Sequence, residues 1–214
     1  MPGPTQRWLQ ASEVVPMFPT LAWKFQLKPQ TRQTMDQAML RALSELRRER
    51  AALAPHEGWQ SEQTLHEREA FAGLADCVQQ AARSVLRFLH IGHDALQITG
   101  CWATVLAPGA AHRPHTHPNN FLSGVYYLRT PQGADTINFH DPRAQTAVIR
   151  PPVTALSAEN TDQVVVRVAN GTLLLFPAWL QHSVDANASR EERISVSFNL
   201  MFPDFAGALS KPLW

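Results

Sequence analysis

Apolar residues in the first half of the chain recur with helical spacing. Over residues 31–50 they stand at steps of three and four, as Met35, Ala38, Met39, Ala42, Leu43 and Leu46. Residues 69–90 repeat this spacing, and Gly92 follows as a stop signal. Because side chains three and four positions apart lie on one face of an α-helix, both segments are predicted to be amphipathic helices. We expect them to support the fold by packing, with no role in chemistry.

From Leu96 onward the pattern changes to short apolar or alternating runs, separated by Pro, Gly and Asn. The runs are Leu96–Leu106, Leu122–Leu128, Thr136–Phe139, Val164–Val168, Leu173–Phe176 and Arg193–Phe202. Short strands at this spacing are typical of an all-β barrel or sandwich. We therefore expect a single domain over 1–214, with two supporting helices in 1–95, a β core over 96–202 and a tail over 203–214.

Composition and charge narrow the class of protein. The chain has 214 residues and a formal net charge of +1, so it can bury a sizeable core and has no general attraction to nucleic acid or membrane. No secretory signal and no apolar run of membrane-spanning length is visible. Two cysteines are too few for a disulfide scaffold. We expect a cytoplasmic protein with no nucleic-acid or membrane partner; its oligomeric state stays open, a homodimer included.

Three of the nine histidines stand in a pattern that suits a metal. His115 and His117 are separated by one residue, and positions i and i+2 of an extended segment point to the same side. His182 follows the apolar run that ends at Phe176. Two imidazoles on one side and a third from a later strand can bind a divalent transition metal. His112 competes for this role, but three positions before His115 in an extended chain it is expected to face away.

One interpretation of this spacing is a cupin-type metal site. Five residues separate Gly109 from His115, and Gly171 precedes His182 at the distance that cupins show. However, the glutamate that cupins place soon after the histidine pair is missing, and Ala186 stands where they have asparagine. The cupin pattern is therefore matched only in part.

The last predicted strand carries a row of polar side chains. Its alternating polar residues are Arg193, Ser195, Ser197 and Asn199. Because they share one side of the strand, they are expected to line the barrel lumen, and that costs free energy unless a polar group occupies the lumen. A bound dicarboxylate would supply this group, and the planar guanidinium of Arg193 suits a carboxylate. A cupin has no need of this arginine.

Five motifs occur together along the chain. They are His-Thr-His-Pro-Asn from His115, Ser123–Tyr127, Asp141–Arg143, Phe176–His182 and Arg193–Asn199. In combination they resemble a family of 2-oxoglutarate/Fe(II)-dependent oxygenases of bacteria and phages, a prolyl-hydroxylase-like group. The resemblance spans nearly the whole chain and implies a mainly β fold with N-terminal helices, namely a double-stranded β-helix of the jelly-roll or cupin-like kind.

The resemblance also implies an enzyme, an oxidoreductase that uses Fe(II), 2-oxoglutarate and O2. The implied metal ligands are His115, His117 and His182. The implied cosubstrate-binding residues are Arg193, Ser195 and Tyr127. His117 departs from the wider superfamily, which has Asp or Glu there. A three-histidine site is neutral in its ligands, so the iron would keep its full 2+ charge, and the same ligands also suit copper or zinc.

The substrate is expected to be a small molecule, an amino acid or a peptide that the enzyme hydroxylates. Candidates for the mouth of the site are Asn119, Asn120, Arg143 and Trp179. The asparagine pair also suits a turn, and Trp179 and Trp102 also suit core or barrel-mouth packing. Two alternatives stay open, a cupin-type metalloenzyme that does not use 2-oxoglutarate and a non-catalytic barrel that binds a metal or ligand.

Overall fold

The computed structural model describes residues 11–50, 52–93, 95–143 and 151–206. Most of the predicted tail, residues 207–214, therefore lies outside the described residues. In chain order the elements are β1 (Trp23–Gln26), α1 (Pro29–Leu46), η1 (Arg48–Arg50), β2 (Gly58–Gln60), η2 (Leu65–Glu67), η3 (Glu69–Phe71), α2 (Ala72–Phe88), β3 (Gln97–Leu106), β4 (His112–His115), β5 (Leu122–Arg129), β6 (Thr136–His140), β7 (Gln163–Arg167), β8 (Thr172–Pro177), β9 (His182–Val184), β10 (Arg193–Met201) and α3 (Pro203–Ala206).

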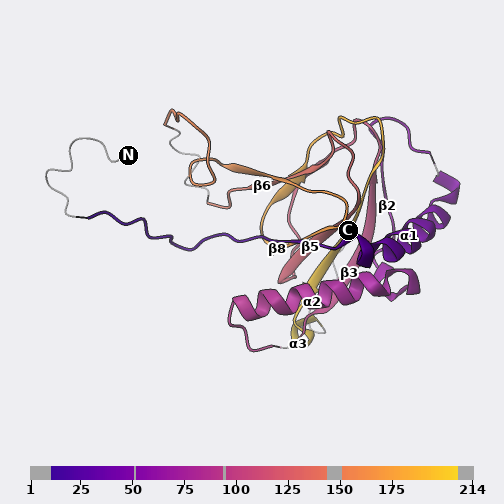
Figure 1. Ribbon diagram of the computed structural model, residues 1–214, viewed down its shortest axis with the longest axis horizontal. Coiled ribbons are helices and arrows are strands. Elements are labelled where there is room, and N and C mark those ends of the chain that lie inside the picture. The colour runs from indigo at the N-terminus through magenta and orange to yellow at the C-terminus, as the bar shows by residue number, and fades with distance from the viewer. Residues whose placement is uncertain (1–10, 51, 94, 144–150, 207–214) are drawn as a thin grey trace.

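The strands form two antiparallel sheets (Figure 1). The major sheet has six strands in the order β1-β8-β5-β10-β3-β2, and the minor sheet has four in the order β4-β9-β6-β7. Strands that follow one another in the chain thus belong to different sheets at several points, as β3 and β4 or β8 and β9 do. This arrangement confirms the expected jelly-roll class.

The two long helices cover one face of the major sheet (Figure 1). Leu43 of α1 and Val85 of α2 belong to the same buried apolar cluster as Tyr126 and Val196 of the sheet. The helical spacing of the first half of the chain therefore serves packing, as predicted. None of the described helices combines the length and apolarity needed to cross a membrane.

A second apolar cluster fills the space between the two sheets. Val125, Tyr127 and Phe176 of the major sheet meet Ile137 and Phe139 of the minor sheet there. Because successive side chains of a strand point to opposite faces, Tyr126 packs under the helices while its neighbour Tyr127 enters the lumen. The lumen is thus lined from both sheets, and apolar side chains pack beside the polar ones in it.

Two short strands come from the N-terminal segment that was expected to hold only helices. β1 pairs with β8 at one edge of the major sheet, and β2 pairs with β3 at the other. They have four and three residues, so neither is long enough to show a clear alternating pattern. Strands on both sides of residue 95 therefore build the barrel.

Gly124 of β5 lies at a crowded point of the major sheet. A Cβ there would overlap the Phe198 ring and lie 2.6 Å from the carbonyl oxygen of Leu174. A packed core cannot absorb this overlap, so Gly124→Ala is expected to lower the free energy of unfolding by about 1–3 kcal/mol or more. Gly92→Ala is the matched control, because no atom lies within 4 Å of its Cβ position. Denaturant unfolding checks the pair, and equal stability of the two variants would contradict the prediction.

Candidate active site

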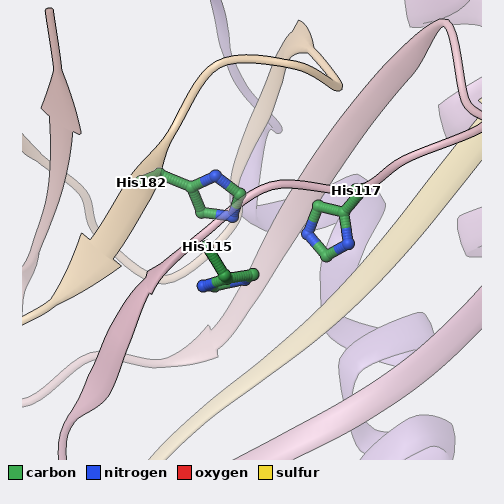
Figure 2. A group of neighbouring side chains, drawn as sticks. All are labelled: His115, His117 and His182. Atoms are coloured by element: carbon green, nitrogen blue, oxygen red, sulfur yellow. The ribbon is translucent and has the colours of Figure 1, made fainter. Parts of the chain in front are cut away.

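The pairing of β4 with β9 brings the three predicted metal ligands together. His115 lies opposite His182 in this pairing. His117 follows in the next loop, where its backbone N–H donates to the carbonyl of Ala178 (2.9 Å). The ring centroids are 4.3 Å apart for His115 and His182, 5.0 Å for His115 and His117, and 5.2 Å for His117 and His182. Figure 2 shows the rings clustered, and one ring nitrogen of each lies within 4.8 Å of the others.

Backbone carbonyls fix the orientation of two of these rings. Nδ1 of His115 lies 2.8 Å from the carbonyl oxygen of Arg113, and Nδ1 of His182 lies 3.0 Å from that of Leu180. A carbonyl can only accept, so Nδ1 carries the proton in both rings. Nε2 is then left with the free lone pair that a metal requires, which is the usual arrangement for histidine ligands.

Burial lowers the pKa of three imidazoles in the lumen, those of His182, His117 and His112. It lowers the pKa of His182 to about 3, although the hydrogen bond to Leu180 acts in the opposite direction. It also lowers the pKa of His117 to about 4, with a smaller effect of the neighbouring histidines. Burial, followed by His115 and Arg193, lowers the pKa of His112 to about 4 as well. Neutral imidazole is the form that binds a metal, so protons compete little with it near neutral pH.

The metal-free protein should lose stability as the pH falls from about 6.5 toward 4. In the unfolded chain a histidine titrates near pH 6.5, whereas the pKa of native His182 is about 3. The unfolded chain therefore binds a proton that the native protein does not, and between about pH 7 and about pH 5 this one histidine should remove about 2 kcal/mol of stability.

Denaturant unfolding at several pH values measures this slope. The His182→Leu variant has no imidazole at this position, so its unfolded chain should take up as much as one proton fewer than the wild type. Its free energy of unfolding should therefore depend less steeply on pH. A variant with the wild-type slope would show that His182 is not held neutral by the fold.

Arg193 of β10 lines a small lumen cavity, with about 30 Å³ of space for water-sized groups, together with Tyr127, Ser195 and His182. The arginine is only 2% exposed, and its guanidinium carbon lies 5.3 Å from the centroid of the Tyr127 ring. It donates one hydrogen bond, of 3.3 Å, to the carbonyl of Thr136. The structure therefore brings the three predicted cosubstrate-binding residues into one cavity.

Two polar atoms of this cavity lack an acceptor. Within the described part of the chain, Nε of Arg193 and the hydroxyl of Tyr127 have no hydrogen-bond partner of acceptable geometry. Burial raises the pKa of Tyr127 to about 12, and the nearby guanidinium opposes that rise. Burying donors without acceptors costs free energy, and a bound carboxylate would remove this cost. The donor set thus fits a dicarboxylate, and the three imidazoles fit a divalent metal.

His112 also faces the cavity, so the expectation that it would point away is wrong. It lies opposite Val184, whereas His115 lies opposite His182, and the register shifts between the two pairs. Three steps along β4 therefore match two steps along β9, which is a β-bulge. The extra residue turns both histidines inward, and Arg113 and Pro114 between them are exposed. Strand alternation alone could not reveal this.

Two of the predicted mouth residues have local structural roles. Asn119 adopts a positive φ of 62°, which asparagine tolerates in turns. The exposed Arg143 forms an ion pair of 2.7 Å with Asp141. The turn conformation of Asn119 and the ion pair of Arg143 thus need no bound substrate to account for them.

The other two mouth residues lie together on the surface. Trp179 is 55% exposed, so of the two expected positions, core or barrel mouth, the core is excluded for it. Trp102 is buried, and its ring lies 5.6 Å from that of His117. Trp179 and Asn120 line a second hollow, with Trp23 and Phe121 among the other lining residues. This hollow is mainly apolar and begins where the loop before β5 meets the loop after β8.

A jelly-roll barrel with three clustered imidazoles and a buried arginine beside one of them fits a class of protein, the metal-dependent oxygenases that use 2-oxoglutarate. Residues 100–199 match the family described as "Putative 2OG-Fe(II) oxygenase", and this range contains all three histidines and Arg193. This part of the chain, somewhat less than half of it, is thus similar to oxygenases that use Fe(II) and 2-oxoglutarate.

Solved structures with the same fold include two prolyl hydroxylases and the hygromycin B complex of HygX. A prolyl-4-hydroxylase of Pseudomonas putida shows 15% identity and a TM-score of 0.58, with 86% of this chain and 93% of the other covered. A Trichoplax adhaerens prolyl hydroxylase, in complex with a hypoxia-inducible factor peptide, shows 14% identity and a TM-score of 0.59, with 89% and 87% covered. HygX of Streptomyces hygroscopicus, with nickel, 2-oxoglutarate and hygromycin B bound, shows 12% identity and a TM-score of 0.56, with 86% and 84% covered. No curated protein sequence matches the chain.

Proposed function

We propose that this oxygenase hydroxylates a small molecule, an amino acid or a peptide, with His115, His117 and His182 as the iron ligands and Arg193 as the anchor of 2-oxoglutarate. One observation carries the proposal: His182 and Arg193 line the same cavity, and Nε of this arginine is buried without an acceptor. A cupin-type enzyme that does not use 2-oxoglutarate would have no reason to bury such an arginine there.

Iron(II) and 2-oxoglutarate, when bound, supply together with O2 the oxidising power that cleaves a substrate C–H bond, and succinate and CO2 are released. The chain itself contributes orientation. The carbonyls of Arg113 and Leu180 hold two of the ligand rings before any metal arrives. Arg193 and Tyr127 offer fixed donors to a carboxylate, and the apolar cavity wall keeps water away from the reacting groups. Its apolar lining residues are Leu106, Val125, Ile137 and Val184.

The neutral ligand set favours a doubly charged cosubstrate. Among the described residues, no Asp or Glu side chain belongs to the three-histidine group. The charge of a bound divalent metal would then be balanced chiefly by the cosubstrate, and the Arg193 guanidinium adds one more positive charge nearby. Opposite charges interact strongly in a partly buried cavity, so metal and 2-oxoglutarate should strengthen each other's binding.

Trp179 and Asn120 are the best supported substrate contacts among the predicted mouth residues. Both line the apolar surface hollow, and the Trp179 side chain is half exposed there. An exposed tryptophan beside a polar amide suits a ligand with an apolar or aromatic group and a hydrogen-bonding edge. The related structures with a peptide and with hygromycin B show that this fold accommodates both sizes of ligand.

A cosubstrate titration tests the proposed function. The anaerobic Fe(II) protein should develop a metal-to-ligand charge-transfer absorption on addition of 2-oxoglutarate. After O2 is admitted, it should form succinate, slowly without substrate and faster with it. No absorption at millimolar 2-oxoglutarate would exclude the oxygenase function and favour a cupin-type or non-catalytic barrel.

A further inference from the structure

His112 is a fourth histidine of the lumen, and the three-histidine group does not include it. Its ring centroid lies 4.3 Å from that of His115, and it lines the same cavity as Arg193 and Tyr127. Its side chain makes no hydrogen bond to the described ranges of the chain. The imidazole is therefore placed between a metal ligand and the cosubstrate anchor, with its polar atoms free.

The bulge that turns His112 inward also serves the metal site. The extra residue of the bulge separates His112 from His115 and leaves the carbonyl of Arg113 free to accept a hydrogen bond from Nδ1 of His115 (2.8 Å). Bulges are used beside active sites to re-aim side chains. One irregularity in β4 therefore orients a metal ligand and places a second imidazole next to it.

His112 faces a cavity of mixed lining. The wall includes the apolar side chains of Leu106, Ile137 and Val184 and the polar ones of Arg193 and Tyr127. The His112 side chain is only partly exposed, so a polar ligand that enters this cavity would meet its imidazole.

We propose that His112 is a positioning residue that donates a hydrogen bond to the carboxylate of 2-oxoglutarate nearest the metal, without being a metal ligand itself. The inference rests on the proposed function, because it requires 2-oxoglutarate in this cavity. The place of His112 beside His115 assigns it the near carboxylate, and Arg193 then serves the far one. The two ends of the cosubstrate would be held by different strands, β4 and β10.

The test compares His112→Phe, which keeps a ring but has no N–H, with His112→Gln, which keeps a donor. In the anaerobic Fe(II) protein, His112→Phe should weaken 2-oxoglutarate binding about 10- to 100-fold and shift the maximum of the charge-transfer absorption. His112→Gln should regain part of the affinity. All variants should still bind one iron per chain, measured by metal analysis. The matched control is His90→Gln, since His90 is exposed at the end of α2 and should leave both readouts unchanged.

Three results would overturn the inference. Wild-type affinity and an unshifted band in His112→Phe would show that the imidazole makes no such contact. Loss of iron from His112→Phe or His112→Gln would make His112 a metal ligand instead. Absence of any band in the wild type would remove the proposed function, and this inference with it. If thermal unfolding shows that phenylalanine disrupts the lumen, His112→Leu takes its place with the same expected loss.

Discussion

His182→Ala is expected to abolish stoichiometric iron binding while the barrel stays folded. Nδ1 of His182 is bonded to the carbonyl of Leu180, which leaves Nε2 free for a metal, and the side chain is only 4% exposed. Changing the partners of a metal ligand typically costs about 10- to 100-fold in affinity. Removing the ligand itself should cost more. His115→Ala and His117→Ala should have the same effect, which metal analysis after anaerobic loading measures.

The matched control for this prediction is His140→Ala. His140 is on the neighbouring strand β6 and contacts Ser183 (2.9 Å), on the opposite face from His182. The His140→Ala variant should bind iron like the wild type, and circular dichroism should show the same fold in all variants. If His117→Ala retained iron while His112→Ala lost it, the ligand assignment would be wrong.

Arg193→Ala should weaken 2-oxoglutarate binding more than any other change outside the metal ligands. A charge-assisted pair in a partly dry lumen is worth roughly 2–5 kcal/mol when one partner is truncated. That corresponds to a loss of about 30-fold to several thousand-fold in affinity. Arg193→Lys should recover only part of the loss, because an ammonium group cannot reproduce the planar fork. The charge-transfer titration of the anaerobic iron protein measures both variants.

Stability measurements separate a binding role of Arg193 from a structural one. The guanidinium is buried, and Nε has no acceptor in the described part of the chain. Replacing such a charge with an apolar side chain is often neutral or stabilising, so Arg193→Leu should leave the metal-free protein at least as stable as the wild type. Iron binding should change little. A large loss of stability together with unchanged 2-oxoglutarate affinity would show that Arg193 is structural and that another residue binds the carboxylate.

Periodicity along the chain predicted most of the regular elements. The predicted helical segments 31–50 and 69–90 overlap α1 (Pro29–Leu46) and α2 (Ala72–Phe88), and each of the six predicted runs overlaps a strand. These elements are long enough for side-chain spacing to report which face is buried, because an amphipathic face must repeat with the period of the backbone. β1, β2, β4 and β9 have only three or four residues, and their existence depends on partners far away in the sequence.

The sequence by itself determined the chemistry of the site: two histidines one residue apart, a third after an apolar strand, and a polar row that begins at Arg193. Only the tertiary structure decided which side chains share the lumen. Pairing of β4 with β9 across a bulge turned His112 inward, where uninterrupted alternation predicts the opposite face. The same packing left Trp179 exposed and Trp102 buried against His117. The physical reason is that a strand's own alternation reports two faces, whereas register, bulges and burial are set by the partner strand and the opposite sheet.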